Sequence, residues 1–450
     1  MKPWYDFPIL LLLVMVLLGC RTAPKDEVVE GMPSHPLRNA KDLDVLMEKI
    51  GDSRIVLLGE ASHGTTEYYA WRSAISKRLI QEKGFTIIGV EGEWADSYRV
   101  NNFVKGPSRD SLQAVAMLRQ YDRWPTWMWG NYEIASLATW MNRYNQEKAN
   151  NEKVGFFGLD VYCLWESMDE LMPHIRGNDS LTKMAIDVRK CFQPYSADPG
   201  EYALGVATAT ADCRKQTERL YRAIMKFTGG ATARAESQFV VQQNALVARN
   251  GENYYRTSVS SDIESWNVRD RHMMQTIKRL LELHGPDSKI IIWEHNTHVG
   301  DARFADMGSP QIVNVGQLVR QEYGRENVFI VGFGSHRGTV TAASGWGSAV
   351  ETMRVPAAKK GSWEDVLNHA GPENRIIISD ELRANKFYMK KWGHRAIGVA
   401  YNPNSEGGNY VKSVIPNRYD AFIYISQTTA LRPIPILPRN EPPDTYPSGT

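Results

Sequence analysis

Residues 54–67 read RIVLLGEASHGTTE, a stretch in which an apolar run ends on a glycine and polar residues follow at once. Residues 55–58, Ile-Val-Leu-Leu, are apolar without interruption, as expected of a strand that is buried on both faces of a parallel sheet. Glu60 and His63 come directly after it. Because α/β proteins bind their ligands at the carboxyl ends of such strands, the stretch predicts both a fold class and the place of a functional site.

The rest of the chain repeats this pattern of short apolar runs separated by helical stretches. Further strands are expected at Thr86–Val90, Val154–Leu159, Lys289–Trp293, Val328–Phe333, Ala396–Ala400 and Ala421–Ile425. Several of these runs are apolar throughout, which favours a mostly parallel central sheet with helices on both faces. The predicted fold class is therefore α/β.

Residues 165–285 contain no comparable run and have helical spacing instead, ending at the helix-stopping pair Gly285 and Pro286. We interpret this region as a helical insertion that covers the active-site edge of the sheet. It divides the catalytic domain into a first part, 41–164, and a second part, 286–431. Residues 432–450 form a proline-rich tail that is expected to be extended or disordered.

The N-terminus has the pattern of an export signal. The apolar run Ile9–Leu18 is shorter than the roughly 20 residues that a membrane-spanning helix needs. It leads into LLGC, residues 17–20, which resembles the lipobox of bacterial lipoproteins. We therefore expect residues 1–20 to be a signal peptide, Cys20 to be lipidated and 21–40 to be a flexible tether. The mature protein would be an extracytoplasmic lipoprotein anchored in a membrane, periplasmic in a Gram-negative cell.

Export also affects how the other cysteines are interpreted, since disulfides persist in oxidising compartments. Cys191 and Cys213 flank one short segment of the helical region and are predicted to pair. Cys163 has no obvious adjacent base, so we expect a buried structural thiol.

Charge does not favour a nucleic-acid partner. The 53 basic and 51 acidic residues give a net charge of +2 and form no basic block. A small-molecule ligand is the remaining expectation.

Polar residues follow four of the predicted strands. They are Glu60 and His63, Glu91, Asp160, and Glu294 with His295 and His298. The carboxyl ends of parallel strands lie at one edge of a sheet, so these side chains are expected to converge there. Helix capping is the alternative role for each of them taken singly.

Among these residues, His63 is the predicted general base. Glu60 and Glu91 could fix its tautomer and raise its basicity toward water. His295 and His298 could donate to an oxyanion or, less characteristically, bind a metal, because no HEXXH motif is present. Arg72, in the helix after the first strand, could assist them or simply form a salt bridge. A G-x-S-x-G elbow is also missing, which makes water the expected nucleophile.

An aromatic stretch, YDRWPTWMWGNYEIASLATW, follows the second predicted strand. Trp124, Trp127 and Trp129 could form the wall of a cleft for a bulky apolar ligand. Packing within the core is the alternative.

The motifs around these residues resemble those of the erythromycin esterase family. The matching stretches include LLGEASHGTTEYY, VGFFGLDVY, SWNVRDRHM, IIIWEHNTHVGDAR and GHRAIGVAYNP, in family order across about residues 50–425. The resemblance implies a hydrolase that opens macrolide lactones with His-activated water and no cofactor. Under this resemblance the functional residues of the family fall on His63, Glu60, Glu91, Arg72, His295 and His298.

Two other functions remain open from the sequence. The same side chains could bind a metal in a metal-dependent hydrolase. A more distant resemblance to Tiki-type metalloproteases and haem-binding lipoproteins also allows a lipid-anchored protein that holds haem or a metal without turnover.

Overall fold

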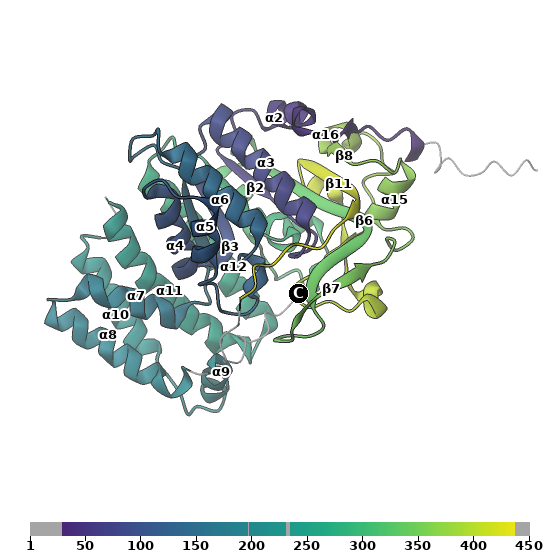
Figure 1. The fold of residues 1–450 in the computed structure, drawn as a ribbon. Coiled ribbons are helices and arrows are strands. Elements are labelled where there is room, and N and C mark those ends of the chain that lie inside the picture. The colour runs from purple at the N-terminus through teal and green to yellow at the C-terminus, as the bar shows by residue number, and fades with distance from the viewer. Residues whose placement is uncertain (1–28, 197, 231–234, 437–450) are drawn as a thin grey trace, which may run out of the picture.

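The structure is a computed structural model that describes residues 29–196, 198–230 and 235–436. Its centre is a mixed sheet in the order β1-β8-β11-β6-β2-β5-β3-β4, with β7 paired to β6 (Figure 1). The strands of this sheet are β1 (His35–Pro36), β2 (Ile55–Leu58), β3 (Ile87–Glu93), β4 (Gly155–Asp160), β5 (Ile290–Trp293), β6 (Val328–Ala343), β7 (Val350–Val355), β8 (Arg375–Ile378) and β11 (Ala421–Thr428). β9 (Trp392–Arg395) and β10 (Tyr410–Ser413) form a separate hairpin-like pair.

From β4 to β11 the pairs along the centre of the sheet are parallel, and β1, β7 and β8 are antiparallel to their neighbours. The predicted mostly parallel sheet flanked by helices is confirmed. Strand β2 explains why the apolar run has no polar residue: Val56 and Leu58 belong to one core cluster, and Ile55 and Leu57 to the cluster on the other face. Each face of the strand is therefore covered by helices.

Helices cover both faces and extend to one side. Their bounds are α2 (Asp44–Ile50), α3 (Thr66–Lys83), α4 (Trp94–Lys105), α5 (Ser111–Leu118), α6 (Tyr132–Asn145), α7 (Leu164–Ile175), α8 (Asp179–Phe192), α9 (Pro199–Ala207), α10 (Arg214–Phe227), α11 (Glu236–Ser258), α12 (Asp262–His284), α13 (Asn296–Val299), α14 (Val315–Tyr323), α15 (Trp363–His369), α16 (Ser379–Arg383) and α17 (Ile415–Arg418). Figure 1 shows α7, α8, α10 and α11 as a bundle beside the sheet. α12 packs Met273, Ile277 and Leu280 against the sheet core, to which α11 also contributes Phe239, Val240 and Val247.

One strand prediction is wrong, and some strands of the structure were not predicted. Residues 396–400 form no strand; Ile397 and Ala400 make isolated bridges to Ser62 and Ala343, and the nearest strand is β9. Conversely, β8 was not predicted, although its residues are fully buried and pair with β11.

The two terminal segments are partly packed. Within the predicted tether, His35–Pro36 pair with β8 and Leu37 is buried, so this part of the segment contacts the sheet rather than being flexible. At the other end, the Ile434 N–H donates to the Gly130 carbonyl, so the tail begins as an extended segment against the loop before α6. The signal peptide, Cys20 and residues 437–450 lie outside the described residues.

The helical bundle contains a disulfide between Cys191, in α8, and Cys213, which precedes α10. Cys163 is a buried free thiol whose pKa is raised by burial. None of the helices in the described ranges is long and apolar enough to span a membrane.

Candidate active site

The turn after β2 brings the first functional residues to the edge of the sheet. Its backbone is held closely: Gly59 N–H donates to the Val331 carbonyl at 2.8 Å, and the Gly64 carbonyl accepts from the Thr341 and Leu431 amides at 2.9 Å. A Cβ at residue 64 would lie 1.8 Å from the Thr341 carbonyl oxygen. The glycine is thus required by neighbouring backbone.

Glu60 lies between a cation and an imidazole. Its Oε1 is 2.9 Å from Nδ1 of His63, and its Oε2 accepts from Nη2 of Arg72 at 2.5 Å. Arg72 is fully buried, with its guanidinium 4.5 Å from the Tyr69 ring and 4.7 Å from the Trp293 ring. Since Nδ1 of His63 is engaged by the carboxylate, Nε2 is the nitrogen left for the cleft that this ring lines.

The turn after β5 supplies the second histidine. His295 caps α13, and its Nδ1 accepts from the Thr297 N–H at 3.3 Å and lies 2.8 Å from the Thr297 hydroxyl. Burial and the nearby His63 hold the pKa of His295 well below its ordinary value, so the ring is neutral. With Nδ1 accepting, the proton of the neutral ring lies on Nε2, which is buried and makes no close hydrogen bond, and the ring also interacts with the Ala61 backbone.

His63 and His295 face each other across this edge, with ring centroids 5.0 Å apart. One ring offers a nitrogen that can accept a proton, and the other offers an N–H that can donate. A base and a hydrogen-bond donor at this spacing could act on the same small group.

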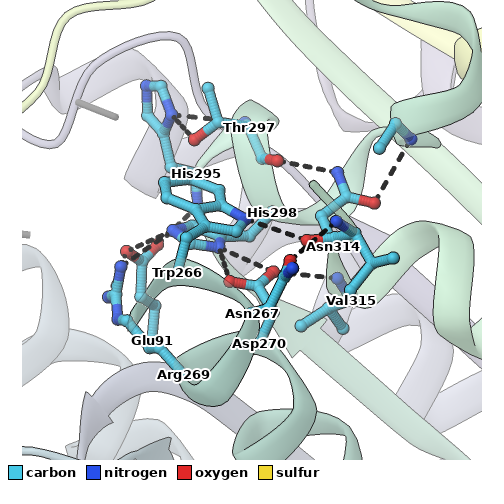
Figure 2. Close-up of polar contacts among 12 residues, drawn as sticks. Glu91, Trp266, Asn267, Arg269, Asp270, His295, Thr297, His298, Asn314 and Val315 are labelled. Carbon is cyan, nitrogen blue, oxygen red and sulfur yellow. Dashed lines mark hydrogen bonds and ion pairs between the residues drawn. The ribbon is translucent and has the colours of Figure 1, made fainter. Parts of the chain in front are cut away.

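Behind the histidines lies a buried ion cluster built around Arg269 of α12 (Figure 2). Its guanidinium donates to both oxygens of Asp160 at 2.6–3.2 Å and to Oε1 of Glu91 at 2.8 Å. The other oxygen of Glu91 accepts the backbone N–H of His295 at 2.7 Å. Burial raises the pKa of Glu91, but His298 and Arg269 outweigh burial and hold it well below its ordinary value. Glu91 is therefore an anion that links β3 to the turn containing His295.

His298 belongs to the ion cluster as well. Its Nδ1 is 3.0 Å from both oxygens of Asp270, and its ring stacks on Trp266 with centroids 4.5 Å apart. Its Nε2 lies 2.9 Å from Nη1 of Arg269 and 3.3 Å from Oε1 of Glu91, contacts that favour opposite protonation states. Burial lowers the pKa of His298, but Asp270 and Glu91 raise it to about 10. The protonated form follows, because it offsets part of the negative charge of the two carboxylates that contact it, Asp270 and Glu91.

Glu294 differs from the other strand-end acids. It is fully buried, neither of its oxygens has a hydrogen-bond partner, and burial raises its pKa well above the ordinary value. It is a neutral carboxylic acid beside the ion cluster and does not line the cleft.

Two clefts meet at this edge. The smaller, of about 90 Å³, is lined by His63, Glu91, Trp124 and Trp129 among others. The larger, of about 760 Å³, runs along α7 and α8 and shares Trp124 and Arg123 with it. Arg123 pairs with Glu93, the last residue of β3, and with Glu166 on α7, at 3.3 and 3.1 Å.

The structure gives the predicted residues different places. His63, Glu91, Trp124 and Trp129 line the small cleft, whereas His295 is buried beside His63. Arg72 and His298 do not line it: each is buried with a carboxylate between it and the cleft, so neither is placed to contact a substrate oxyanion. Trp127, with 1% of its surface exposed, packs in the core, which is the alternative that the sequence left open, and it lines neither of the two clefts. The 3₁₀ turn Thr126–Met128 directs it inward.

Sequence reasoning missed Arg269 and Asp270. Both lie in the region interpreted as a bundle over the site, but α12 packs on the sheet and brings them to the strand ends. A signal was present in the sequence: Arg269 is three residues after Trp266 and four before Met273, which places a charge on the apolar face of the helix.

A metal site was the alternative use of these side chains. Among the residues that the structure describes, no group of three or more His, Cys, Asp or Glu is arranged to hold a metal ion. Both ring nitrogens of His298 already contact protein groups.

The comparisons with known proteins concern this site and its scaffold. A sequence model described as erythromycin esterase matches residues 80–428, which include Glu91, Arg269 and His298 but begin after His63. An erythromycin esterase type II of Escherichia coli is 23% identical over 400 residues, covering 81% of this chain and 93% of that protein. A putative hydrolase of Bacillus subtilis (strain 168), YbfO, is 22% identical over 425 residues, covering 86% and 87%.

Solved structures share the fold. A succinoglycan biosynthesis protein superposes with a TM-score of 0.73 at 18% identity, covering 91% of this chain and 97% of that one. A mutant of the erythromycin esterase EreC in its open conformation gives a TM-score of 0.64 at 15% identity, covering 88% and 98%. At these identities the likeness shows the fold alone.

Proposed function

Because the chain belongs to the erythromycin esterase family, we propose that this hydrolase cleaves a carboxylic ester of a small molecule, with macrolide lactones as the leading substrate class. His63 activates the water that attacks the ester carbonyl. The alternatives of a metal-dependent hydrolase and of a haem-binding protein are outcomes of the test below.

The observation that carries this proposal is the pairing of His63 with Glu60 opposite the ring of a neutral His295. Glu60 accepts from Nδ1 of His63, which fixes the tautomer that leaves Nε2 free to take a proton. Nε2–H of His295 makes no close hydrogen bond, and a substrate oxygen that enters beside His63 would replace the looser backbone contact with Ala61 as its acceptor. Both groups are held by buried contacts before any substrate arrives.

The reaction follows from these two groups. Nε2 of His63 removes a proton from water while the water oxygen bonds to the ester carbon, and the carbonyl oxygen becomes an oxyanion. Nε2–H of His295 donates to that oxyanion. The C–O bond to the alcohol then breaks, and the proton on His63 passes to the leaving alkoxide, giving the free acid and the alcohol. A general base contributes about 10² to 10⁴ in rate, and one oxyanion donor about 10² to 10³.

The remaining polar residues act through these two. Arg72 holds Glu60 in place, and Glu91 holds the backbone of the His295 turn. Arg269 and the protonated His298 keep Glu91 ionised. Arg72 and His298 line neither cleft and are positioning residues, whereas Glu91 and Arg269 also line the small cleft beside His63.

The clefts fit a substrate with a large part remote from the scissile bond. The small cleft leaves room for the ester group, and the larger one is lined by Trp165, Met168 and Phe192 as well as charged residues. Trp124 lies at the junction, where it would contact both parts of a bulky lactone.

We further propose that Cys20 is lipidated and that the enzyme is anchored outside the cytoplasm. The LLGC sequence after the apolar run supports this. An anchored esterase would meet its substrate before entry into the cell.

The test is incubation of the purified protein with a panel of 14-membered macrolides and aryl esters, followed by mass spectrometry. Ring opening adds one water to the substrate mass. A His63→Ala variant serves as the control, and it should lower kcat by about 10² to 10⁴ at nearly constant KM. Loss of wild-type turnover with EDTA would favour the metal-dependent alternative, and a Soret band without turnover would favour haem binding.

A further inference from the structure

A second pair of histidine and glutamate lies near the site and is not used by the proposed reaction. His394 of β9 has Nδ1 2.5 Å from Oε1 of Glu364 on α15, and Glu364 also accepts the Arg395 backbone N–H at 3.0 Å. Both side chains are buried, with 1% and 0% of their surface exposed. Neither lines the two clefts described above, so the pair is not placed to contact a substrate.

The other nitrogen of His394 contacts Asn296, which directly follows His295 and is the first residue of α13. Nδ2 of Asn296 is 3.1 Å from Nε2 of His394 and donates to the Phe333 carbonyl at 2.6 Å. The Asn296 side-chain nitrogen can only donate, so Nε2 of His394 accepts and the ring proton lies on Nδ1, facing Glu364. Burial lowers the pKa of His394, in agreement with a neutral ring.

Asn296 in turn joins the two catalytic turns. Its backbone N–H donates to the Glu60 carbonyl at 2.8 Å, directly linking the turn after β5 to the turn after β2. Its Oδ1 occupies the space beside Gly59, where a Cβ would lie 2.2 Å away. The orientation of this one amide therefore bears on how His63 and His295 face each other.

We propose that His394, held by Glu364, is a positioning residue that fixes the Asn296 amide and thereby the spacing of His63 and His295. This rests on the proposed function for its kinetic consequence, though not for its structural one. The GHR segment, residues 393–395, would then be functional without contacting substrate.

Two substitutions of His394 separate its two contacts. His394→Asn keeps a donor near the position of Nδ1, toward Glu364, and loses the acceptor for Asn296. His394→Gln can place an acceptor near the position of Nε2 and loses the contact with Glu364. We expect His394→Asn to lower kcat by about 10-fold or more at nearly constant KM, because the loss lies in the alignment of reacting groups. His394→Gln should retain more of the wild-type kcat at a similar or larger loss of Tm.

Equal losses of kcat in the two variants, or losses that simply follow Tm, would overturn the proposal. If neither variant folds, Asn296→Ser tests the same contact from its other side, and an unchanged kcat would overturn it equally. A crystal structure of the His394→Asn variant gives a readout apart from activity. The ring separation of His63 and His295 should depart from 5.0 Å; an unchanged separation would refute the positioning role, whereas a wild-type protein that cleaves no ester refutes only the proposed function.

Discussion

Asp270→Asn tests whether His298 carries a proton at neutral pH. Asp270 is fully buried and lies 3.0 Å from Nδ1 of His298, and it also accepts the Val315 N–H. The substitution keeps the shape and removes the negative charge. Burial and Arg269 are then opposed by Glu91 alone, so the pKa of His298 falls from about 10 toward its ordinary value of 6.5.

The expected loss of unfolding free energy follows from the pKa shift of His298. A folded-state pKa above the unfolded value stabilises the protein fully below pH 6.5, and this contribution is lost as the pH rises toward about 10. From pH 7 to that pKa is about three units, each about 1.4 kcal/mol, or about 4 kcal/mol in all. Asp270 supplies only part of this, since Glu91 also raises the pKa of His298.

The assay is urea unfolding of the wild type and the variant at pH 7, 8, 9 and 10, followed by tryptophan fluorescence. The difference in unfolding free energy should be largest at pH 7, up to about 4 kcal/mol, and should narrow toward pH 10. Asp301→Asn is a matched control, because Asp301 is equally buried but pairs with Arg303 and Arg320, which stay charged. A gap for Asp270→Asn that stays constant from pH 7 to pH 10 would refute the protonated His298.

Three further predictions address the donor, the disulfide and the anchor. His295→Ala should lower kcat by about 10² to 10³, and His295→Gln, which can place an N–H near Nε2, should recover part of it; equal kcat values would exclude the donor role. Replacing Cys191 and Cys213 by serine should lower the unfolding free energy by about 3 kcal/mol in urea titrations, since the bond closes a loop across 22 residues. Cys20→Ala should move the protein from the membrane to the soluble fraction and abolish acyl labelling; unchanged fractionation would contradict lipidation.

The sequence predicted the centre of the sheet because its strands are short apolar runs that end in polar turns. β2 is the clearest case: alternate residues of its apolar run pack into the two cores on opposite faces of the sheet. The same rule failed at residues 396–400. Their backbone forms only isolated bridges, at Ile397 and Ala400, and no continuous strand pairing. β9 was not predicted, because Trp392–Arg395 (WGHR) is not an apolar run. The strand is stabilised by pairing with β10 and by contact between Trp392 and Trp363 of α15.

The candidate site was predictable in composition but not in orientation. Strand ends indicated that Glu60, His63, Glu91 and His295 would converge, which is a property of parallel sheets. Which of these side chains lines the cleft depends on tertiary contacts, and a local sequence pattern does not reveal those contacts. Arg72 is the example: the sequence left open an oxyanion contact or a salt bridge, and in the structure Arg72 forms a salt bridge with Glu60.

If His63 is the base, as we propose, the charge of the buried ion cluster favours the proton transfer. Three carboxylates, Glu91, Asp160 and Asp270, form ion pairs with two cations, Arg269 and His298, so the formal charge of the cluster is −1. The pair formed by Glu60 and Arg72 adds no net charge. When His63 takes a proton from water it becomes a cation beside this net negative charge, in a site where burial strengthens the attraction. The same field opposes the oxyanion, so a neutral donor such as Nε2–H of His295 is needed at the carbonyl oxygen, and the two histidines divide the opposite charges of the transition state between them.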